Sequence, residues 1–89
     1  MVITGSAIFL SPNDSGLVIR RLREFPQVTF QVASESGSEL IVNFEAKNQD
    51  ELEILCRKLR DEIPEIIDIG HIYINFEDEI DHLKSLTSD

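Results

Sequence analysis

The sequence predicts an α+β domain in which one four-stranded antiparallel sheet is covered on a single face by two helices. Residues 38–59 change their hydrophobic period from two to about 3.6, which is typical of a strand followed by an amphipathic helix. Strand-like and helix-like segments on either side of this stretch give the order βαββαβ. This is the order of ferredoxin-like folds, in which right-handed crossovers place both helices on the same face of the sheet.

Length and charge limit the organisation and the partners of the chain. Its 89 residues make one ferredoxin-like domain, expected over residues 1–76, followed by an acidic C-terminal tail over residues 77–89. The 8 Lys and Arg residues stand against 17 Asp and Glu residues, which gives a formal net charge of -9. This charge disfavours nucleic acid and anionic membranes as partners and favours a basic peptide.

The first predicted strand and helix occupy residues 2–25. Residues 2–10 are apolar and β-branched, with small residues in the middle, which suits a central strand beneath closely packed helices. Ser11 followed by Pro12 predicts a helix start, because the hydroxyl can cap the chain and proline favours the first helical position. Pro26 should end this helix. The apolar stripe of the helix consists of Val18, Ile19, Leu22 and Phe25.

Two alternating segments predict a β-hairpin. Residues 28–33 and residues 40–46 alternate between apolar and polar side chains, and residues 34–37 between them favour a turn. The apolar set is expected to face the helices and consists of Val28, Phe30, Val32, Leu40, Val42, Phe44 and Ala46.

A second helix and a last strand complete the predicted domain. Asn48 and Glu51 fit a capping box, so the helix should begin near Gln49, and Pro64 should end it. Its apolar stripe consists of Leu52, Leu55, Cys56, Leu59 and Ile63. Residues 66–76 are long, β-branched and aromatic, which predicts the fourth strand.

One face of the predicted sheet has no helix over it and is therefore open to a partner. The hairpin should expose the side chains of the second phase, which are Thr29, Gln31, Ile41, Asn43 and Glu45. If Ala7 and Phe9 point inward, the first strand adds Thr4, Ser6 and Ile8. In the last strand, Asp68 and Gly70 interrupt the apolar character of one of the two alternating sets of side chains. The other set is therefore favoured for the open face, and it consists of Ile69, His71, Tyr73 and Asn75.

Residues for catalysis or metal binding are not arranged in recognisable motifs. His71 and His82 have no neighbouring ligand pair of the spacing that metal sites use, and no glycine-rich phosphate loop follows a strand. Cys56 has no second cysteine and lies on the apolar stripe of a helix. We therefore expect neither an enzyme nor a bound metal or cofactor. Without a secretory signal or a membrane-spanning run, the expected location is the cytoplasm.

Four short segments of the chain are distinctive: GSAIF at residues 5–9, EFPQV at residues 24–28, SELIVNFEA at residues 38–46 and IIDIGHIY at residues 66–73, followed by an acidic end. Together they resemble the NapD family. The resemblance covers residues 3 to 79. It implies a cytoplasmic chaperone that binds the twin-arginine signal peptide of a periplasmic nitrate reductase precursor and delays export until the molybdenum cofactor is inserted. It also implies that the peptide lies on the sheet.

The resemblance and the open face together define the expected binding residues. The candidate peptide-binding set is Ser6, Ile8, Ile41, Asn43, Glu45, His71 and Tyr73. The acidic run that includes Glu77, Asp78, Glu79 and Asp81 is either a solubilising tail or a site for arginines of the partner. Two other functions stay open, an ACT-like domain that senses a small molecule and a bare subunit-interaction module.

Overall fold

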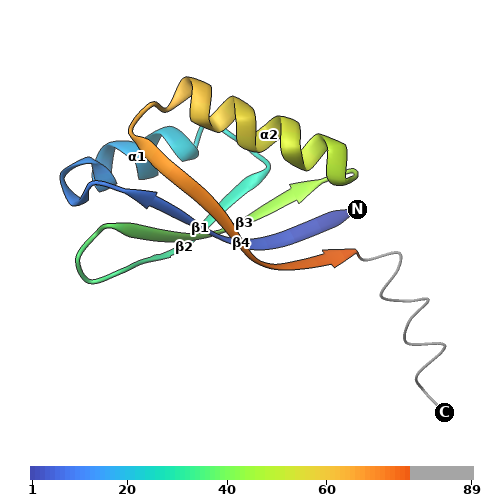
Figure 1. Cartoon of the computed structure of the whole chain (residues 1–89), viewed down its shortest axis with the longest axis horizontal. Helices are drawn as coiled ribbons and strands as arrows, with labels where there is room; N and C mark the ends of the chain where they lie inside the picture. Colours follow the sequence, from blue (N-terminus) through green and yellow to red (C-terminus); the bar gives the residue numbers. More distant parts are fainter. Residues whose placement is uncertain (77–89) are drawn as a thin grey trace, which may run out of the picture.

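The computed structural model describes residues 1–76 and confirms the α+β ferredoxin-like arrangement. Its elements are β1 (Val2–Leu10), α1 (Ser15–Leu22), β2 (Val28–Ala33), β3 (Glu39–Ala46), α2 (Gln49–Glu62) and β4 (Ile66–Phe76). The strands form one antiparallel sheet in the order β2-β3-β1-β4, and both helices lie on the same side of it (Figure 1). The acidic tail predicted over residues 77–89 lies outside the described residues.

The two helices differ in how well the sequence predicts their ends. A 3-10 turn at Pro12–Asp14 precedes α1, the side chain of Ser11 makes no capping bond, and α1 ends at Leu22. In contrast, α2 begins at Gln49 as predicted, because the amide of Glu51 donates to Oδ1 of Asn48 at 2.9 Å. Neither helix within residues 1–76 is long and apolar enough to span a bilayer.

The core lies between the sheet and the helices. It is formed by side chains of all four strands and both helices, and the fully buried ones include Ile8, Val18, Leu22, Leu40, Val42, Phe44, Leu52, Leu59 and Ile63. Phe25 lies beyond the end of α1 but still packs into this cluster. The predicted inward phase of β3 is therefore confirmed, with Leu40, Val42 and Phe44 all buried.

The facing of β1 is opposite to the prediction. Thr4, Ser6 and Ile8 are each 0% exposed on the helix side, whereas Phe9 is 39% exposed on the other side. Thr4 pairs with Phe44 and Ser6 with Val42, so small β1 residues lie beside bulky β3 residues in the same layer. Ile8 and Leu10 supply the buried aliphatic area that Ala7 and Phe9 were expected to supply.

A bulge in β4 separates His71 from Tyr73. Gly5 pairs with Tyr73 and Ser6 with His71, so β4 has one extra residue, Ile72, between two consecutive residues of β1. His71 therefore turns to the helix side while Tyr73 stays on the opposite side. The prediction that the two side chains share a face is wrong, and so is the open placement of Ile69, which is 8% exposed in the core.

An irregularity between β2 and β3 changes the facing of β2. Phe30 pairs with Val42 and Val32 with Ile41, which leaves Gln31 as the extra residue on β2. Val32 consequently lies on the side of Ile41, away from the helices, and is 55% exposed. The prediction that Val32 packs in the core is wrong, and Ala33 takes the inward position instead.

Candidate functional site

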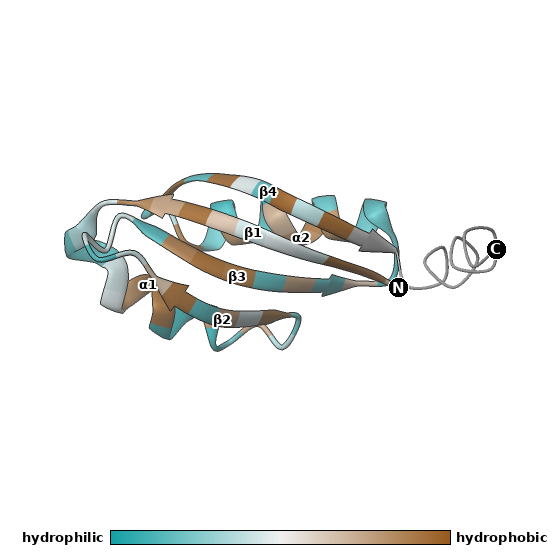
Figure 2. Cartoon of the chain, turned by 90° about the horizontal axis from the view of Figure 1, so that it is seen from below, coloured by the Kyte–Doolittle hydropathy of each residue, from teal (hydrophilic) through white to brown (hydrophobic). Residues whose placement is uncertain are grey.

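The sheet surface opposite α1 and α2, called here the helix-free face, is the candidate site (Figure 2). Because directly paired residues of antiparallel strands share a face, the strand registers divide this surface into rows that cross the sheet. The first row is Glu39, Phe9 and Asp68, and the second is Val32, Ile41, Ala7 and Gly70. The third row is Thr29, Asn43, Gly5 and Tyr73, and the fourth contains Glu45 and Ile3.

Apolar side chains stay accessible in the middle of this face. Val32 is 55% exposed and Tyr73 is 47% exposed, while Ile3 and Ile41 are half-buried beside them. These residues come from all four strands, so they form a patch across the sheet and not a stripe along one strand. Exposed apolar patches of this kind, bordered by polar residues, are typical of binding surfaces.

Two aromatic rings of the helix-free face lie on glycines of the neighbouring strand. A Cβ atom on Gly5 would lie 2.7 Å from Cδ1 of Tyr73 and would overlap Cε1 of the same ring. A Cβ atom on Gly70 would lie 3.7 Å from Cε2 of Phe9, which is an ordinary contact. The missing Cβ of Gly5 thus lets the Tyr73 ring lie close against β1, while the side chain stays 47% exposed to a partner.

Gly5→Ala is expected to displace the Tyr73 ring and to lower the free energy of unfolding by about 1–2 kcal/mol, because the new methyl group occupies the position of the ring. Gly70→Ala is the matched control, and we expect little or no loss because its methyl group makes only a normal contact with Phe9.

Urea denaturation gives the stability of both variants. The chain has 1 Tyr and 0 Trp, so its intrinsic fluorescence reports on Tyr73 alone. Equal stability and equal fluorescence in the two variants would contradict the packing of Tyr73 on Gly5.

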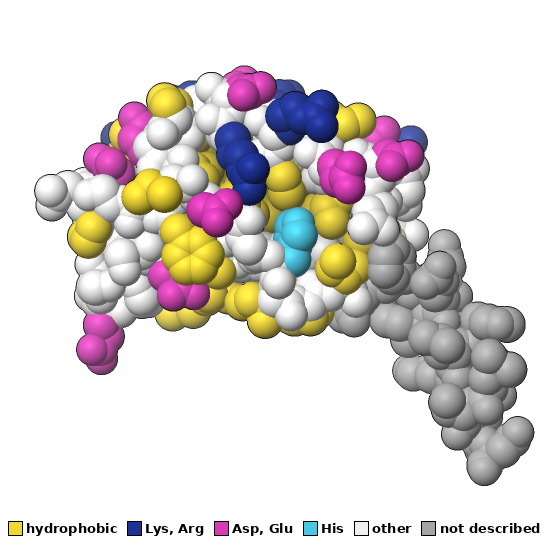
Figure 3. All heavy atoms as spheres, in the orientation of Figure 1, with side chains coloured by type: hydrophobic (Ala, Val, Ile, Leu, Met, Phe, Trp, Pro, Cys, Tyr) yellow, Lys and Arg dark blue, Asp and Glu magenta, His cyan; other side chains and the backbone are white. Residues whose placement is uncertain are grey.

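The charges are distributed unequally between the two sides of the molecule. None of the strands contains Lys or Arg, while the helix-free face contains Glu39, Glu45 and Asp68. The basic residues of the described chain lie on or beside the helices, and they are Arg20, Arg21, Arg23, Lys47, Arg57, Lys58 and Arg60. In Figure 3 the basic side chains accordingly gather over the helical layer, and hydrophobic side chains line the sheet below it.

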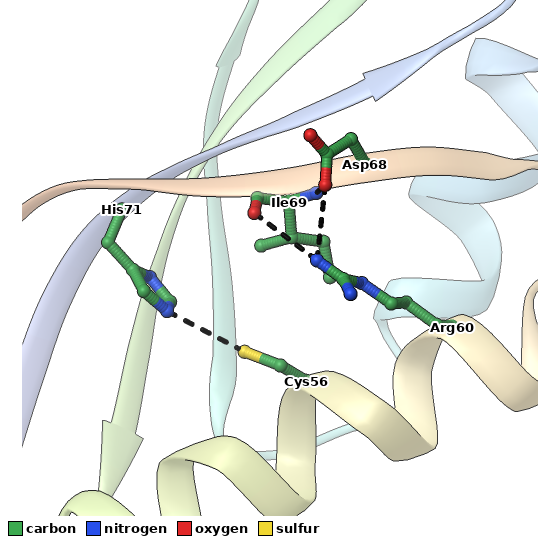
Figure 4. A network of polar contacts seen from close by, with 5 residues as sticks. All are labelled: Cys56, Arg60, Asp68, Ile69 and His71. Atoms are coloured by element: carbon green, nitrogen blue, oxygen red, sulfur yellow. Dashed lines mark hydrogen bonds and ion pairs between the residues drawn. The ribbon is translucent and has the colours of Figure 1, made fainter.

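His71 belongs to a polar chain between the sheet and α2, not to the helix-free face. The hydroxyl of Ser6 donates to Oγ1 of Thr4 at 3.1 Å, and Oγ of Ser6 lies 2.7 Å from Nδ1 of His71. Nε2 of His71 faces Sγ of Cys56 at 4.0 Å (Figure 4). The His71 ring also meets Phe44 edge-on, with 6.3 Å between the ring centroids.

The neighbouring thiol is not an activated nucleophile. Burial raises the pKa of the Cys56 thiol, and this effect outweighs the opposing charge of Arg60, while Glu53 adds to the rise. The fraction of thiolate at neutral pH is therefore smaller than in an exposed cysteine, which is unfavourable for covalent catalysis.

Cys56 is expected to react with iodoacetamide at least about tenfold more slowly in the folded protein than in urea, because only the thiolate attacks and folding lowers its population. The rates should be compared at pH 8, where a raised pKa leaves the folded thiol protonated. A folded-state rate equal to that of free cysteine would contradict the buried environment.

A groove at one end of the domain is a weaker candidate. It is lined by residues that include Met1, Pro26, Lys47, Ile54 and Lys58, beside Glu45 and Glu51. Charges of both signs surround it, so it has no single electrostatic preference. Within residues 1–76, no group of three or more His, Cys, Asp or Glu side chains is placed to hold a metal ion.

The structure brings together part of the predicted site. Ile41, Asn43, Glu45 and Tyr73 lie on the helix-free face, whereas Ser6, Ile8 and His71 lie on the other side of the sheet. Sequence reasoning missed Phe9, Val32 and Asp68 on this face. Val2, Ile8 and Leu10 share one phase of β1, and this signal in the sequence already indicated that Phe9 points the other way.

The class of the domain follows from its architecture, which is a ferredoxin-like α+β sandwich of one sheet and two helices. No protein-family model and no curated protein sequence matches the chain. Among solved structures, the chain is similar to the solution structure of the E. coli Tat proofreading chaperone protein NapD. The TM-score is 0.71 at 17% sequence identity, and the match covers 86% of this chain and 80% of that chain. At this identity the likeness establishes the fold.

Proposed function

We propose that this protein is a NapD-like chaperone, without enzymatic activity, that binds a twin-arginine signal peptide on the helix-free face. The observation that carries the proposal is the pairing of exposed apolar side chains with acidic residues on that face, in a sheet whose strands contain no Lys or Arg. A twin-arginine signal combines a cationic start with an apolar stretch. The face offers Tyr73, Ile41 and Val32 to the apolar stretch and carboxylates to the arginines.

The proposed client is the precursor of a periplasmic nitrate reductase that carries a molybdenum cofactor. Binding in the cytoplasm would cover the signal peptide and so delay export until the cofactor is in place. Ile41, Asn43, Glu45 and Tyr73 stay in the proposed peptide-binding set, which now also includes Phe9 and Val32. The similarity in fold to a Tat proofreading chaperone supports this proposal.

Isothermal titration with a synthetic twin-arginine signal peptide tests the proposal. We expect saturable binding with a Kd in the micromolar range or tighter, which corresponds to about -8 kcal/mol or better. If the peptide contains neither Tyr nor Trp, a change in tyrosine fluorescence reports contact at or near Tyr73. The absence of both heat and a fluorescence change with every twin-arginine peptide of the host would contradict the proposal.

A further inference from the structure

We propose that Glu39, Phe9 and Asp68 form a subsite that holds an arginine side chain of the bound peptide. The proposal rests on the proposed function and assigns the recognition of positive charge to one row of the helix-free face. Phe9 of β1 pairs directly with Glu39 of β3 on one side and with Asp68 of β4 on the other. The row therefore places one aromatic residue between two acidic residues, and the Phe9 ring lies over Gly70 of the same edge strand as Asp68.

This combination suits a guanidinium group better than any other cation of a peptide. Phe9 is 39% exposed, so one side of its ring is open for a planar guanidinium to stack on. Paired residues of antiparallel strands have Cα atoms about 4.5–5.5 Å apart, so both carboxylates can reach over the edges of the ring. The donors of the guanidinium fork can then bond to both acids, which the compact ammonium of lysine cannot do while stacking.

Asp68 already binds a guanidinium within the chain. Nη2 of Arg60 donates to Oδ1 of Asp68 at 3.2 Å and to the carbonyl oxygen of Ile69 at 3.4 Å (Figure 4). The side chains of Arg60 and Asp68 are 51% and 66% exposed, so water screens the pair and it can exchange with another arginine. Arg60 is thus an intramolecular competitor for Asp68.

The carboxylates of Asp68 and Glu39 can each accept a further hydrogen bond from a bound arginine. Oδ1 of Asp68 also accepts from the amide of Ile69 at 2.9 Å, which fixes the carboxylate, and Oδ2 accepts no hydrogen bond within residues 1–76. Glu39 forms no ion pair with any side chain in the described part of the chain. An arginine entering this row would therefore displace at most one weak contact.

The position of the row also predicts the direction of the peptide. Successive rows lie about 7 Å apart along the strands, because each residue advances a strand by about 3.4 Å. With an arginine over Phe9, the neighbouring apolar stretch crosses Ile41 and Val32 and reaches Tyr73. The fourth row, at the opposite end, offers the single carboxylate of Glu45 beside Ile3.

Peptide titrations of three charge variants test the subsite. Glu39→Gln and Asp68→Asn are each expected to raise the Kd about three- to tenfold, because each removes one charged acceptor. Asn at residue 68 keeps an oxygen for the amide of Ile69, so the backbone contact survives. Asp61→Asn on α2 is the control, since it changes the net charge equally on an exposed residue of the helical layer, and the Kd should change less than about twofold.

A second peptide series identifies the group that is bound. With glutamine in place of the contacting arginine, Asp68→Asn should change the Kd less than about twofold, because the two groups no longer interact. An undiminished effect of Asp68→Asn on that peptide would overturn the subsite. Arg60→Gln should tighten binding of the arginine peptide about two- to threefold by removing the competitor, and weaker or unchanged binding would contradict competition for Asp68.

The outcomes separate this subsite from the function on which it rests. If the parent protein binds the peptide and both Glu39→Gln and Asp68→Asn bind it equally well, the subsite is wrong while the proposed function stands. If the parent protein binds no twin-arginine peptide, the proposed function itself fails. Melting curves of each variant exclude misfolding as the cause of a lost affinity.

Discussion

Phe44→Ala should lower the free energy of unfolding by about 3–5 kcal/mol, which is the cost of a large cavity in a close-packed core. Phe44 is 0% exposed, it pairs with Thr4, and it forms an edge-on contact with the His71 ring. Removing the Phe44 ring therefore also removes the aromatic contact that packs against the His71 ring. Urea denaturation followed by circular dichroism measures the loss.

Phe9→Ala is the matched control for this prediction, because it removes the same side chain from the helix-free face. Phe9 is 39% exposed, so its removal should cost less than about 1.5 kcal/mol. A similar loss of stability in the two variants would contradict the assignment of β1 and β3 faces to core and surface.

Tyr73→Ala should weaken binding of a twin-arginine signal peptide by about 1–3 kcal/mol, the effect expected of an aromatic anchor near the centre of an interface. The ring is 47% exposed and lies on Gly5, so its outer side is available to a partner. Fold stability should fall by no more than about 1 kcal/mol, because little of the core is lost. Titration calorimetry and thermal melting of the same sample measure the two effects.

Ile54→Ala provides the comparison for Tyr73→Ala, since Ile54 is 55% exposed on α2, in the helical layer. Its peptide affinity should equal that of the parent protein. If Tyr73→Ala binds the peptide as tightly as Ile54→Ala does, Tyr73 is not an anchor for the peptide. The peptide would then bind through other residues of the face.

The fold was predictable because its signals are local and agree with one another. Alternation in residues 40–46, the cap at Asn48 and the helical stripe through Leu52 and Leu59 each determine an element without reference to the rest of the chain. The order of the elements then restricts the topology through the handedness of the crossovers. The start of α1 was less predictable, since Ser11 does not cap it and a 3-10 turn intervenes.

The facing of individual strands was predictable only where no bulge occurs. One extra residue reverses the alternation, so Ile72 moves His71 and Tyr73 to opposite sides, and Gln31 does the same to Phe30 and Val32. Neither bulge has a marker in the sequence, because both depend on how the neighbouring strand pairs.

The site was predictable as a face but not as a set of residues. Topology alone requires one sheet surface without helices, and β3 was assigned its correct phase. The rows that join Phe9 to Asp68 and Tyr73 to Gly5 depend on the registers of β1 and β4, which only the structure provides. In β1, small residues occupy both phases, and the shared phase of Val2, Ile8 and Leu10 was the signal that the prediction did not use. The burial of Thr4 and Ser6 follows from the size of Phe44 and Val42 opposite them.

The most direct test of the binding face is an NMR titration of the ¹⁵N-labelled protein with a twin-arginine signal peptide. The largest changes in amide chemical shift are expected in β1, β3 and β4, around Phe9, Ile41 and Tyr73, with small changes along α1 and α2. Changes centred on the helices or on the groove beside Lys47 and Ile54 would contradict binding on the helix-free face.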